Sequence, residues 1–222
     1  MEQHIVRILK IEPVTHNVKK FTLERPEQFM YTPGQATEIS INQPGLENEG
    51  RPFTMTGLPH EEHLEFVIKI YKGHNGVTEK LDGLKEKDEL ILHDVFGTIN
   101  YQGPGLFVAG GAGITPFIAI LRDLHGQKEL TGNTLLFANR AEEDIILRKE
   151  LAEMLGQHFI NILESTNSPG MIKGYITKEL LGQHLRPSEY CYVCGPEKFN
   201  SIMVQNLKEL GIPEIRIITE QS

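Results

Sequence analysis

Cysteine is scarce in this sequence, with two residues among 222, and this excludes a disulfide framework. The chain has no apolar run of about 18 residues, no apolar signal core and no Arg-rich presequence, so no membrane span or targeting segment is predicted. Basic charge is also low, because 22 Lys and Arg stand against 30 Asp and Glu, for a net charge of −8. Without a basic stripe, a nucleic-acid surface is excluded. We therefore expect a cytoplasmic protein with neither membrane nor nucleic acid as a partner.

The first hundred residues have the pattern of short β-strands separated by Gly, Pro and Asn. The clearest strand is His63–Tyr71, where polar and apolar residues alternate as in a half-buried strand. Similar runs occur at Ile5–Ile11, Val18–Leu23, Thr37–Ile41, Phe53–Met55 and Glu89–Leu92. Only Val77–Leu84 has a helical pattern. Short strands with turn signals between them predict a small antiparallel β-barrel as a domain over residues 1–100.

From Gly105 onward, strand patterns alternate with helical ones. The predicted strands are Leu106–Ala109, Thr134–Ala138, Phe159–Leu163, Tyr190–Val193 and Ile215–Ile218. The predicted helices include Glu143–Leu155, Thr177–Leu185 and Glu197–Leu210. This alternation predicts an α/β domain over residues 105–222, with a parallel sheet covered by helices on both faces. Tyr101–Gly105 is the natural linker between the two domains.

A glycine-rich turn follows the first predicted strand of the second domain. Gly110, Gly111 and Gly113 let the backbone turn tightly and approach a ligand without intervening Cβ atoms. Thr115 can cap the next helix, and Pro116 suits its first position, where an N–H would be unpaired anyway. Free amides at the positive end of a helix favour a diphosphate. The run lacks the last glycine of G-x-G-x-x-G and the Gly-Lys-Ser/Thr of a P-loop, so a purely structural turn is the alternative.

Three further motifs accompany this glycine run. Residues 51–54 (Arg-Pro-Phe-Thr) start a predicted strand, residues 74–78 (His-Asn-Gly-Val-Thr) lead into the short helix, and residues 192–196 (Tyr-Val-Cys-Gly-Pro) end a late strand. Together with the Pro33–Gln35 turn, this set closely resembles the ferredoxin–NADP reductase family of flavin enzymes over essentially the whole chain. The resemblance implies a flavin-binding antiparallel barrel followed by a nicotinamide-nucleotide domain, the architecture that the periodicity also predicts.

The resemblance gives the residues of the Arg-Pro-Phe-Thr motif roles in flavin binding. Arg51 would pair with a flavin phosphate, for which a planar, bidentate guanidinium is suited. Pro52 belongs to the same motif, Phe53 would stack on the isoalloxazine, and Thr54 would place a hydroxyl near flavin N5, where hydride arrives. The alternatives are a solvated loop arginine, a core phenylalanine and an ordinary strand threonine.

The second motif departs from the family pattern. Gly76, Val77 and Thr78 would offer amides and a hydroxyl to the flavin diphosphate at a helix start. The usual family spacing is a glycine, two residues, then Ser or Thr. Here one residue separates Gly76 from Thr78, unless Asn75 takes the role of the glycine.

The third motif contains a C-x-x-C pair, which could indicate redox or zinc chemistry. Residues three apart on a strand point to opposite faces, so Cys191 and Cys194 should not pair, and one C-x-x-C leaves a zinc site short of ligands. The resemblance implies that Cys194, Gly195 and Pro196 lie beside the nicotinamide, at the carboxyl end of a parallel strand. Cys191 is interpreted as a core residue.

The end of the chain matches some family members only in part. Those members carry a carboxylate two residues before a terminal aromatic that covers the flavin. Glu220 matches the carboxylate, whereas Ser222 replaces the aromatic. The resemblance implies that Glu220 relays protons near N5, with a solvated tail residue as the alternative. If the tail reaches the site, the nicotinamide face should be more open than in those relatives.

The resemblance implies a flavin-dependent NAD(P)H oxidoreductase. Hydride would pass from NADH or NADPH to FAD, which the family uses in preference to FMN, and electrons would leave to flavodoxin, ferredoxin or a small-molecule acceptor. The acceptor must be separate, because the sequence has no cysteine cluster with iron–sulfur spacing. The alternatives are a free-flavin reductase, and a non-catalytic nucleotide-binding sensor or electron-transfer subunit on the same scaffold.

The preference between the two nicotinamides depends on the residues after two predicted strands. In the resembled family, the stretch Asn139–Asp144 meets the adenosine ribose. Arg140 could accept a 2′-phosphate, but three carboxylates follow it, and those acids could instead cap a helix. The next loop, Ser165–Asn167 and then Gly174–Tyr175, offers Lys173 as its one cation. The balance predicts a weak preference or one for NADH.

Overall fold

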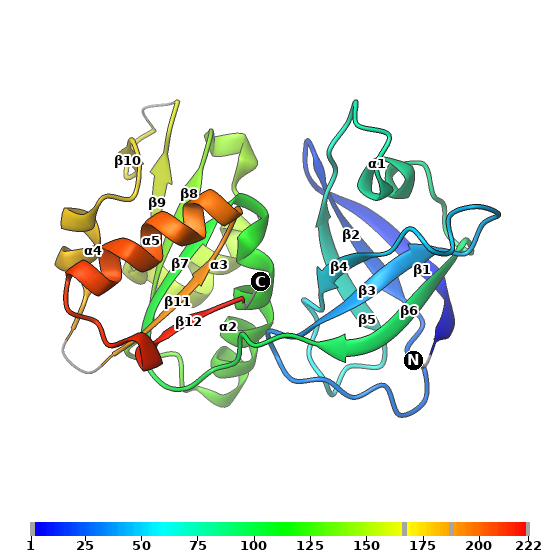
Figure 1. The fold of residues 1–222 in the computed structure, drawn as a ribbon, viewed down its shortest axis with the longest axis horizontal. Coiled ribbons are helices and arrows are strands. Elements are labelled where there is room, and N and C mark those ends of the chain that lie inside the picture. The colour runs from blue at the N-terminus through cyan, green and yellow to red at the C-terminus, as the bar shows by residue number, and fades with distance from the viewer. Residues whose placement is uncertain (1–2, 166–167, 187–188, 221–222) are drawn as a thin grey trace.

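The first domain is an antiparallel sheet that closes on itself (Figure 1). The computed structural model describes residues 3–165, 168–186 and 189–220. The strands of this domain are β1 (His4–Thr15), β2 (Val18–Leu23), β3 (Ala36–Ile41), β4 (Arg51–Thr54), β5 (Leu64–Lys69) and β6 (Glu89–Phe96), with one helix, α1 (Val77–Asp82). Their order in the sheet is β4-β3-β6-β1-β2-β5. A bridge between Met55 and Phe66 joins the two ends of the sheet, so it curls into a barrel around a core that includes Phe21, Phe66 and Ile39.

The second domain is a parallel sheet with helices on both faces (Figure 1). Its strands are β7 (Gly105–Gly110), β8 (Thr134–Asn139), β9 (Phe159–Leu163), β10 (Ile172–Lys173), β11 (Tyr190–Cys194) and β12 (Ile217–Thr219), in the order β10-β9-β8-β7-β11-β12. Its helices are α2 (Thr115–Gln127), α3 (Arg148–Leu155), α4 (Lys178–His184) and α5 (Glu197–Glu209). Strand β7 packs Phe107 against α2 and Val108 into the cluster with α4 and α5, so it is buried on both faces.

The predicted fold class is confirmed, and one predicted helix is wrong in part. The span Glu143–Leu155 is not one helix: a 3₁₀ turn over Glu142–Asp144 precedes α3, which begins at Arg148. Leu147 has a φ of 49°, in the left-handed region, and this breaks the helical path. The carboxylate of Asp144 accepts a hydrogen bond from the N–H of Ala141, which holds the turn.

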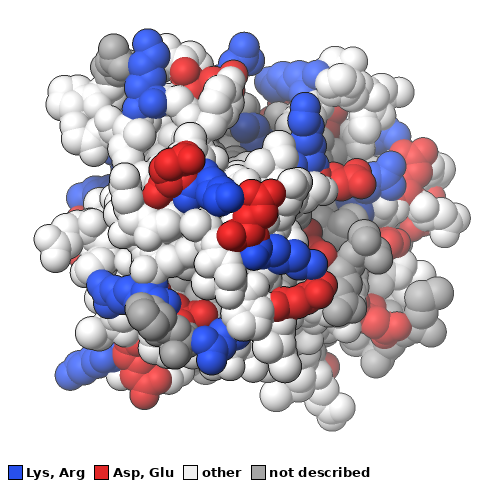
Figure 2. Space-filling model, turned by 60° about the vertical axis from the view of Figure 1, so that its left-hand side comes forward, with Lys and Arg blue, Asp and Glu red and all other residues white. Residues whose placement is uncertain are grey.

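The two domains share an apolar contact. Val18 and Val67 of the barrel belong to the same buried cluster as Phe117 and Leu121 of α2. The face of the molecule in Figure 2 carries basic and acidic side chains interspersed, rather than a field of one sign. Among the described residues, none of the helices has the length and apolar character needed to cross a bilayer.

Candidate active site

A cleft of about 660 Å³ is lined by residues of both domains. From the barrel it receives Pro52, Phe53, Thr54, Val67, Ile68, Lys69, Tyr71 and Thr78. From the second domain it receives Gly110, Gly111, Ala112, Gly113, Thr115, Ala138, Asn139, Arg140, Glu164, Gly174, Tyr175, Cys194, Gly195, Pro196, Phe199 and Glu220. The cleft therefore brings together most of the residues that the sequence singled out. The lining does not include Arg51, Gly76, Val77 or Pro116.

The glycine turn at the cleft differs in one detail from the sequence prediction. A 3₁₀ turn over Gly111–Ile114 stands between β7 and α2, so Ile114 is the cap residue and Thr115 is the first residue of the helix. The expectation that Thr115 caps the helix is wrong: its hydroxyl donates to the carbonyl of Ala112 at 3.1 Å. Pro116 lies in the first turn of α2, one position later than predicted.

The turn comes too close to β11 for a side chain at Gly113. A Cβ atom there would clash with the backbone carbonyl of Cys194. Gly111 has a φ of 53°, which glycine adopts without strain. The glycines thus allow the β7 turn and the end of β11 to meet at the cleft.

Cys194 lies at the carboxyl end of β11 and is buried, with its strand paired to Ala109 of β7. Cys191 packs in the cluster on the opposite face of the sheet, and both cysteines are free. The expectation that the two cysteines point apart is confirmed. Burial, and then the charge and hydrogen bond of Glu220, raise the pKa of the Cys194 thiol, so it is neutral at physiological pH.

Glu220 reaches the cleft from the end of β12. Glu220 is exposed and lines the same cavity as Thr54. Its carboxylate lies close enough to Cys194 to raise the pKa of the thiol. A carboxylate at this place can exchange protons with solvent and with a group bound in the cleft. Ser222, where some members of the resembled family carry an aromatic, lies outside the described residues.

Strand β4 carries the Arg-Pro-Phe-Thr motif along the edge of the cleft. Thr54 is buried and pairs with Ala36 of β3, and Phe53 is half-buried beside the barrel core. Arg51 is exposed at the start of the strand, where it donates to the carbonyl of Gly50 at 2.7 Å. Arg51 therefore lies at the start of β4, outside the cleft lining, and Thr54 lies at the end of the strand, within that lining.

The carboxylate of Glu79, a residue that the sequence analysis did not predict to be important, organises the loop before α1. Glu79 accepts the backbone N–H groups of Gly73 at 3.0 Å, His74 at 3.1 Å and Asn75 at 2.7 Å, and these bonds lower the pKa of its carboxyl. Asn75 has a φ of 49°, the conformation that favours glycine. Gly76 is the cap residue of α1, so Glu79 is the third residue of the helix. An acid at that position is a known capping signal, and it could have identified Glu79 from the sequence.

Within α1, the three residues of the second motif have different surroundings. Val77 is buried in the barrel core, whereas Thr78 lines the cleft and accepts a hydrogen bond from the N–H of Tyr71 at 3.3 Å. Gly76 leaves open space around its Cα. Of this motif, the Thr78 side chain is the one that the structure brings to the cleft.

The far end of the cleft lies at the carboxyl ends of β8 and β9. Its lining includes Arg140, Tyr175 of the expected loop, and Glu164, which the sequence did not single out. The Tyr175 hydroxyl donates to the Glu164 carboxylate at 2.8 Å. Two of the three acids after Arg140 bind other residues of the chain: Glu142 binds Arg148 and Ser168, and Asp144 caps its turn. The cleft lining at this end includes Glu164 and none of those three acids. Thr166 and Asn167, also expected near here, lie outside the described residues.

Both halves of the chain match models of known domain families. Residues 3–105 match the FAD-binding domain, and residues 107–205 match the oxidoreductase NAD-binding domain. The boundary between the two matches lies at the start of β7, where the barrel gives way to the parallel sheet.

Relatives cover most of the chain. NADH-cytochrome b5 reductase 1 of Dictyostelium discoideum is 30% identical over 93% of this chain and 77% of that protein. An uncharacterised oxidoreductase of Saccharomyces cerevisiae is 29% identical over 86% of this chain, which spans 65% of the yeast protein's length. A ferredoxin NADP⁺ reductase structure from Neisseria gonorrhoeae, with bound FAD and NADP, shares the fold with a TM-score of 0.86 at 20% identity, over 99% of this chain and 98% of that one.

Proposed function

Because the chain belongs to the FAD- and NAD(P)-binding oxidoreductases of ferredoxin–NADP reductase type, we propose that its cleft transfers hydride from a reduced nicotinamide nucleotide to FAD. The observation that carries this proposal is the meeting of Thr54 from the barrel and Cys194 from the second domain in one cleft. The volume of about 660 Å³ suits a cofactor site, since such sites are commonly about 300–1,000 Å³.

The residues of the cleft fit the two cofactors. FAD, when bound, supplies an acceptor for the two electrons and the hydrogen of the nicotinamide hydride, and a carrier that releases electrons to a further acceptor. Phe53 presents an aromatic face, and Thr54 a hydroxyl, on the barrel side. Thr78 adds a hydroxyl for the diphosphate, and Arg51 a guanidinium at the outer end of β4.

On the opposite side, the turn Gly110–Gly113 and the segment Cys194–Pro196 would hold the nicotinamide nucleotide. The glycines admit a ligand close to the backbone amides, and the small neutral thiol of Cys194 leaves room for a flat ring. Glu220, beside Cys194, would exchange a proton between solvent and the site. The protein thus contributes position, hydrogen bonds and exclusion of water.

The experiment that tests the function is anaerobic titration of the purified protein. A yellow protein that bleaches with NADH or NADPH is the expected result. A colourless protein that turns over only with added flavin would favour the alternative of a free-flavin reductase. Absence of bleaching with either nucleotide, with and without added flavin, would contradict both and leave the non-catalytic reading.

We expect the preference between NADH and NADPH to be weak or to favour NADH. Glu164 and Arg140 both line the cleft, and the charge of Glu164 would repel a 2′-phosphate that Arg140 attracts. Steady-state kcat/KM values for the two nucleotides measure the preference. A preference for NADPH above about a hundredfold, some 2.7 kcal/mol, would contradict this expectation. Glu164→Gln should shift the ratio toward NADPH if the repulsion operates.

The electron acceptor is proposed to be a small redox protein. The relatives include a protein named a cytochrome b5 reductase, and a solved structure of the same fold is named a ferredoxin reductase. A haem protein, an iron–sulfur protein and flavodoxin are therefore the acceptors to compare, with a quinone and ferricyanide as small-molecule controls. Reduction rates with this panel, at fixed NADH, rank them. A cytoplasmic enzyme is part of this proposal, and cell fractionation tests it.

A further inference from the structure

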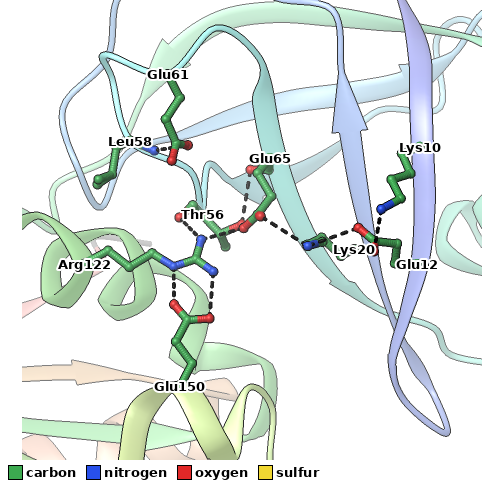
Figure 3. Close-up of polar contacts among 9 residues, drawn as sticks. All are labelled: Lys10, Glu12, Lys20, Thr56, Leu58, Glu61, Glu65, Arg122 and Glu150. Atoms are coloured by element: carbon green, nitrogen blue, oxygen red, sulfur yellow. Dashed lines mark hydrogen bonds and ion pairs between the residues drawn. The ribbon is translucent and has the colours of Figure 1, made fainter. Parts of the chain in front are cut away.

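Arg122 joins the two domains outside the cleft, and the function proposed above gives it no role. It lies in α2, and its Nη1 donates to the carbonyl of Thr56 at 2.9 Å and to Oε1 of Glu65 at 2.6 Å, both in the barrel (Figure 3). Its Nε and Nη2 donate to the two carboxylate oxygens of Glu150, in α3, at 2.5 and 3.0 Å. One guanidinium therefore ties the barrel to two helices of the second domain.

Burial, charge and a further hydrogen bond stabilise the contact between Arg122 and Glu65. The side chains of Arg122 and Glu65 are each 18% exposed, so solvent screens their interaction only weakly. Burial by itself would lower the pKa of Arg122, but the bonds and charges of Glu150 and Glu65 outweigh it and raise the pKa, so the guanidinium is always charged. The hydroxyl of Thr56 also donates to Oε1 of Glu65, at 2.8 Å. A planar donor fork fixes direction as well as distance.

The two barrel segments that Arg122 binds, and its own helix, lead to the cleft. Thr56 lies two residues beyond Thr54, which is the last residue of the strand that carries the flavin-side motif. Glu65 lies in β5, just before the cleft residues Val67–Lys69. Helix α2 itself begins at the glycine turn on the nicotinamide side. The bonds of Arg122 therefore connect two barrel segments that reach the cleft to the helix that begins at its other side.

We propose that Arg122 is a positioning residue for hydride transfer. This proposal rests on the function proposed above. Its fork holds the β4 and β5 ends of the barrel against α2, so that the two bound rings meet at reacting distance. Hydride transfer is sensitive to such placement, because a misplacement of about 1 Å can lower a rate by about a hundredfold. The apolar part of the interface, around Val18 and Val67, keeps the domains together but has no directional bond of this kind.

The test is Arg122→Met in the FAD-loaded enzyme, which keeps an unbranched apolar stem and removes the fork. Anaerobic stopped-flow should show the limiting rate of flavin reduction by NADH lowered by about tenfold or more. FAD content and the dissociation constant of NADH should stay within about twofold, and the charge-transfer absorbance of the nicotinamide–flavin complex should weaken. Arg122→Lys, with one point donor, should lie between the parent and Met. Arg148→Met is the matched control, since Arg148 pairs with Glu142 inside one domain.

The outcomes separate this inference from the proposed function. If the parent enzyme is not reduced by NADH or NADPH, the proposed function fails. If the parent is reduced and folded Arg122→Met matches its limiting rate, the positioning role is wrong. A parent-like rate with weakened NADH binding would also overturn it. If Arg122→Met does not fold, Glu150→Gln and Arg122→Lys are judged by the same criteria, with parent-like rates in both contradicting the role.

Discussion

At the scale of single residues, the chemistry of the site is set by the surroundings of a few side chains. The sequence does not show whether Cys194 is a thiol or a thiolate. In the structure, burial and Glu220 raise the pKa of its thiol, so Cys194 is a small neutral group instead of a thiolate nucleophile. The carboxylate of Glu79 accepts hydrogen bonds from three backbone amides and therefore stabilises the conformation of the loop before α1. Identity alone did not assign either role.

Arg51→Ala should weaken FAD binding by about tenfold or more. A guanidinium paired with a phosphate contributes about 1.5–3 kcal/mol, and Arg51 is exposed, with a hydrogen bond to the neighbouring Gly50 carbonyl that a phosphate would replace. Titration of FAD into apoprotein measures the affinity. Arg7→Ala, which removes another exposed arginine of the barrel, is the control and should bind FAD like the parent. Equal affinities in Arg51→Ala and parent would rule out the phosphate role.

Thr54→Ala and Cys194→Ala should each slow reduction of bound FAD by about tenfold, which corresponds to about 1.4 kcal/mol in the barrier, with FAD content nearly intact. Both side chains line the cleft between the domains, away from Arg51 at the outer end of β4. Stopped-flow reduction by NADH measures the effect. Cys191→Ala, on the same strand but the other face, is the matched control for Cys194. Parent-like rates in both cleft variants would contradict their assignments.

At the scale of elements, the sequence was most informative where periodicity decides the structure. Strands β2 and β9 have the predicted bounds. The sequence was less informative at turns, where hydrogen bonds compete. The 3₁₀ turn at Gly111–Ile114 takes the cap position from Thr115, and the left-handed Leu147 splits a predicted helix. Such choices depend on contacts with other elements, and periodicity does not report them.

Gly113→Ala should destabilise the second domain by about 1–3 kcal/mol, because the new methyl group must displace the backbone carbonyl of Cys194. In a chain of this length that corresponds to a loss of very roughly 2–12 °C in Tm. Thermal denaturation followed by circular dichroism measures it. Gly126→Ala is the opposing control: it lies within α2 with open space around it, and should raise stability by about 0.5–1 kcal/mol. A neutral Gly113→Ala would contradict the close approach.

At the scale of the whole molecule, the order of the two domains and their fold classes could be predicted, but not how they are joined. Barrel strands and strand–helix alternation are visible locally in the sequence. The contact of Arg122 with Thr56 and Glu65 joins positions more than fifty residues apart, and a charged residue on an amphipathic helix is usually a solvated one. The cleft lies between the domains, and contacts between distant positions, polar at Arg122 and apolar around Val18 and Val67, join the barrel to α2 beside it.

Stability with added FAD distinguishes a resident cofactor from a flavin substrate. Ligand binding to the folded state adds about 2.7 kcal/mol when free FAD is a hundred times its Kd, but only about 0.4 kcal/mol when FAD equals its Kd. For a domain pair of 222 residues, the first case raises Tm by about 5–11 °C and the second by about 1 °C. If FAD is a resident cofactor with a Kd of about 0.1 µM, then 10 µM FAD is about a hundredfold excess over that Kd. Thermal denaturation of the apoprotein with 10 µM FAD should then show the larger shift in Tm. A shift near 1 °C, together with turnover on added flavin, would move the function from a FAD-holding reductase to a free-flavin reductase.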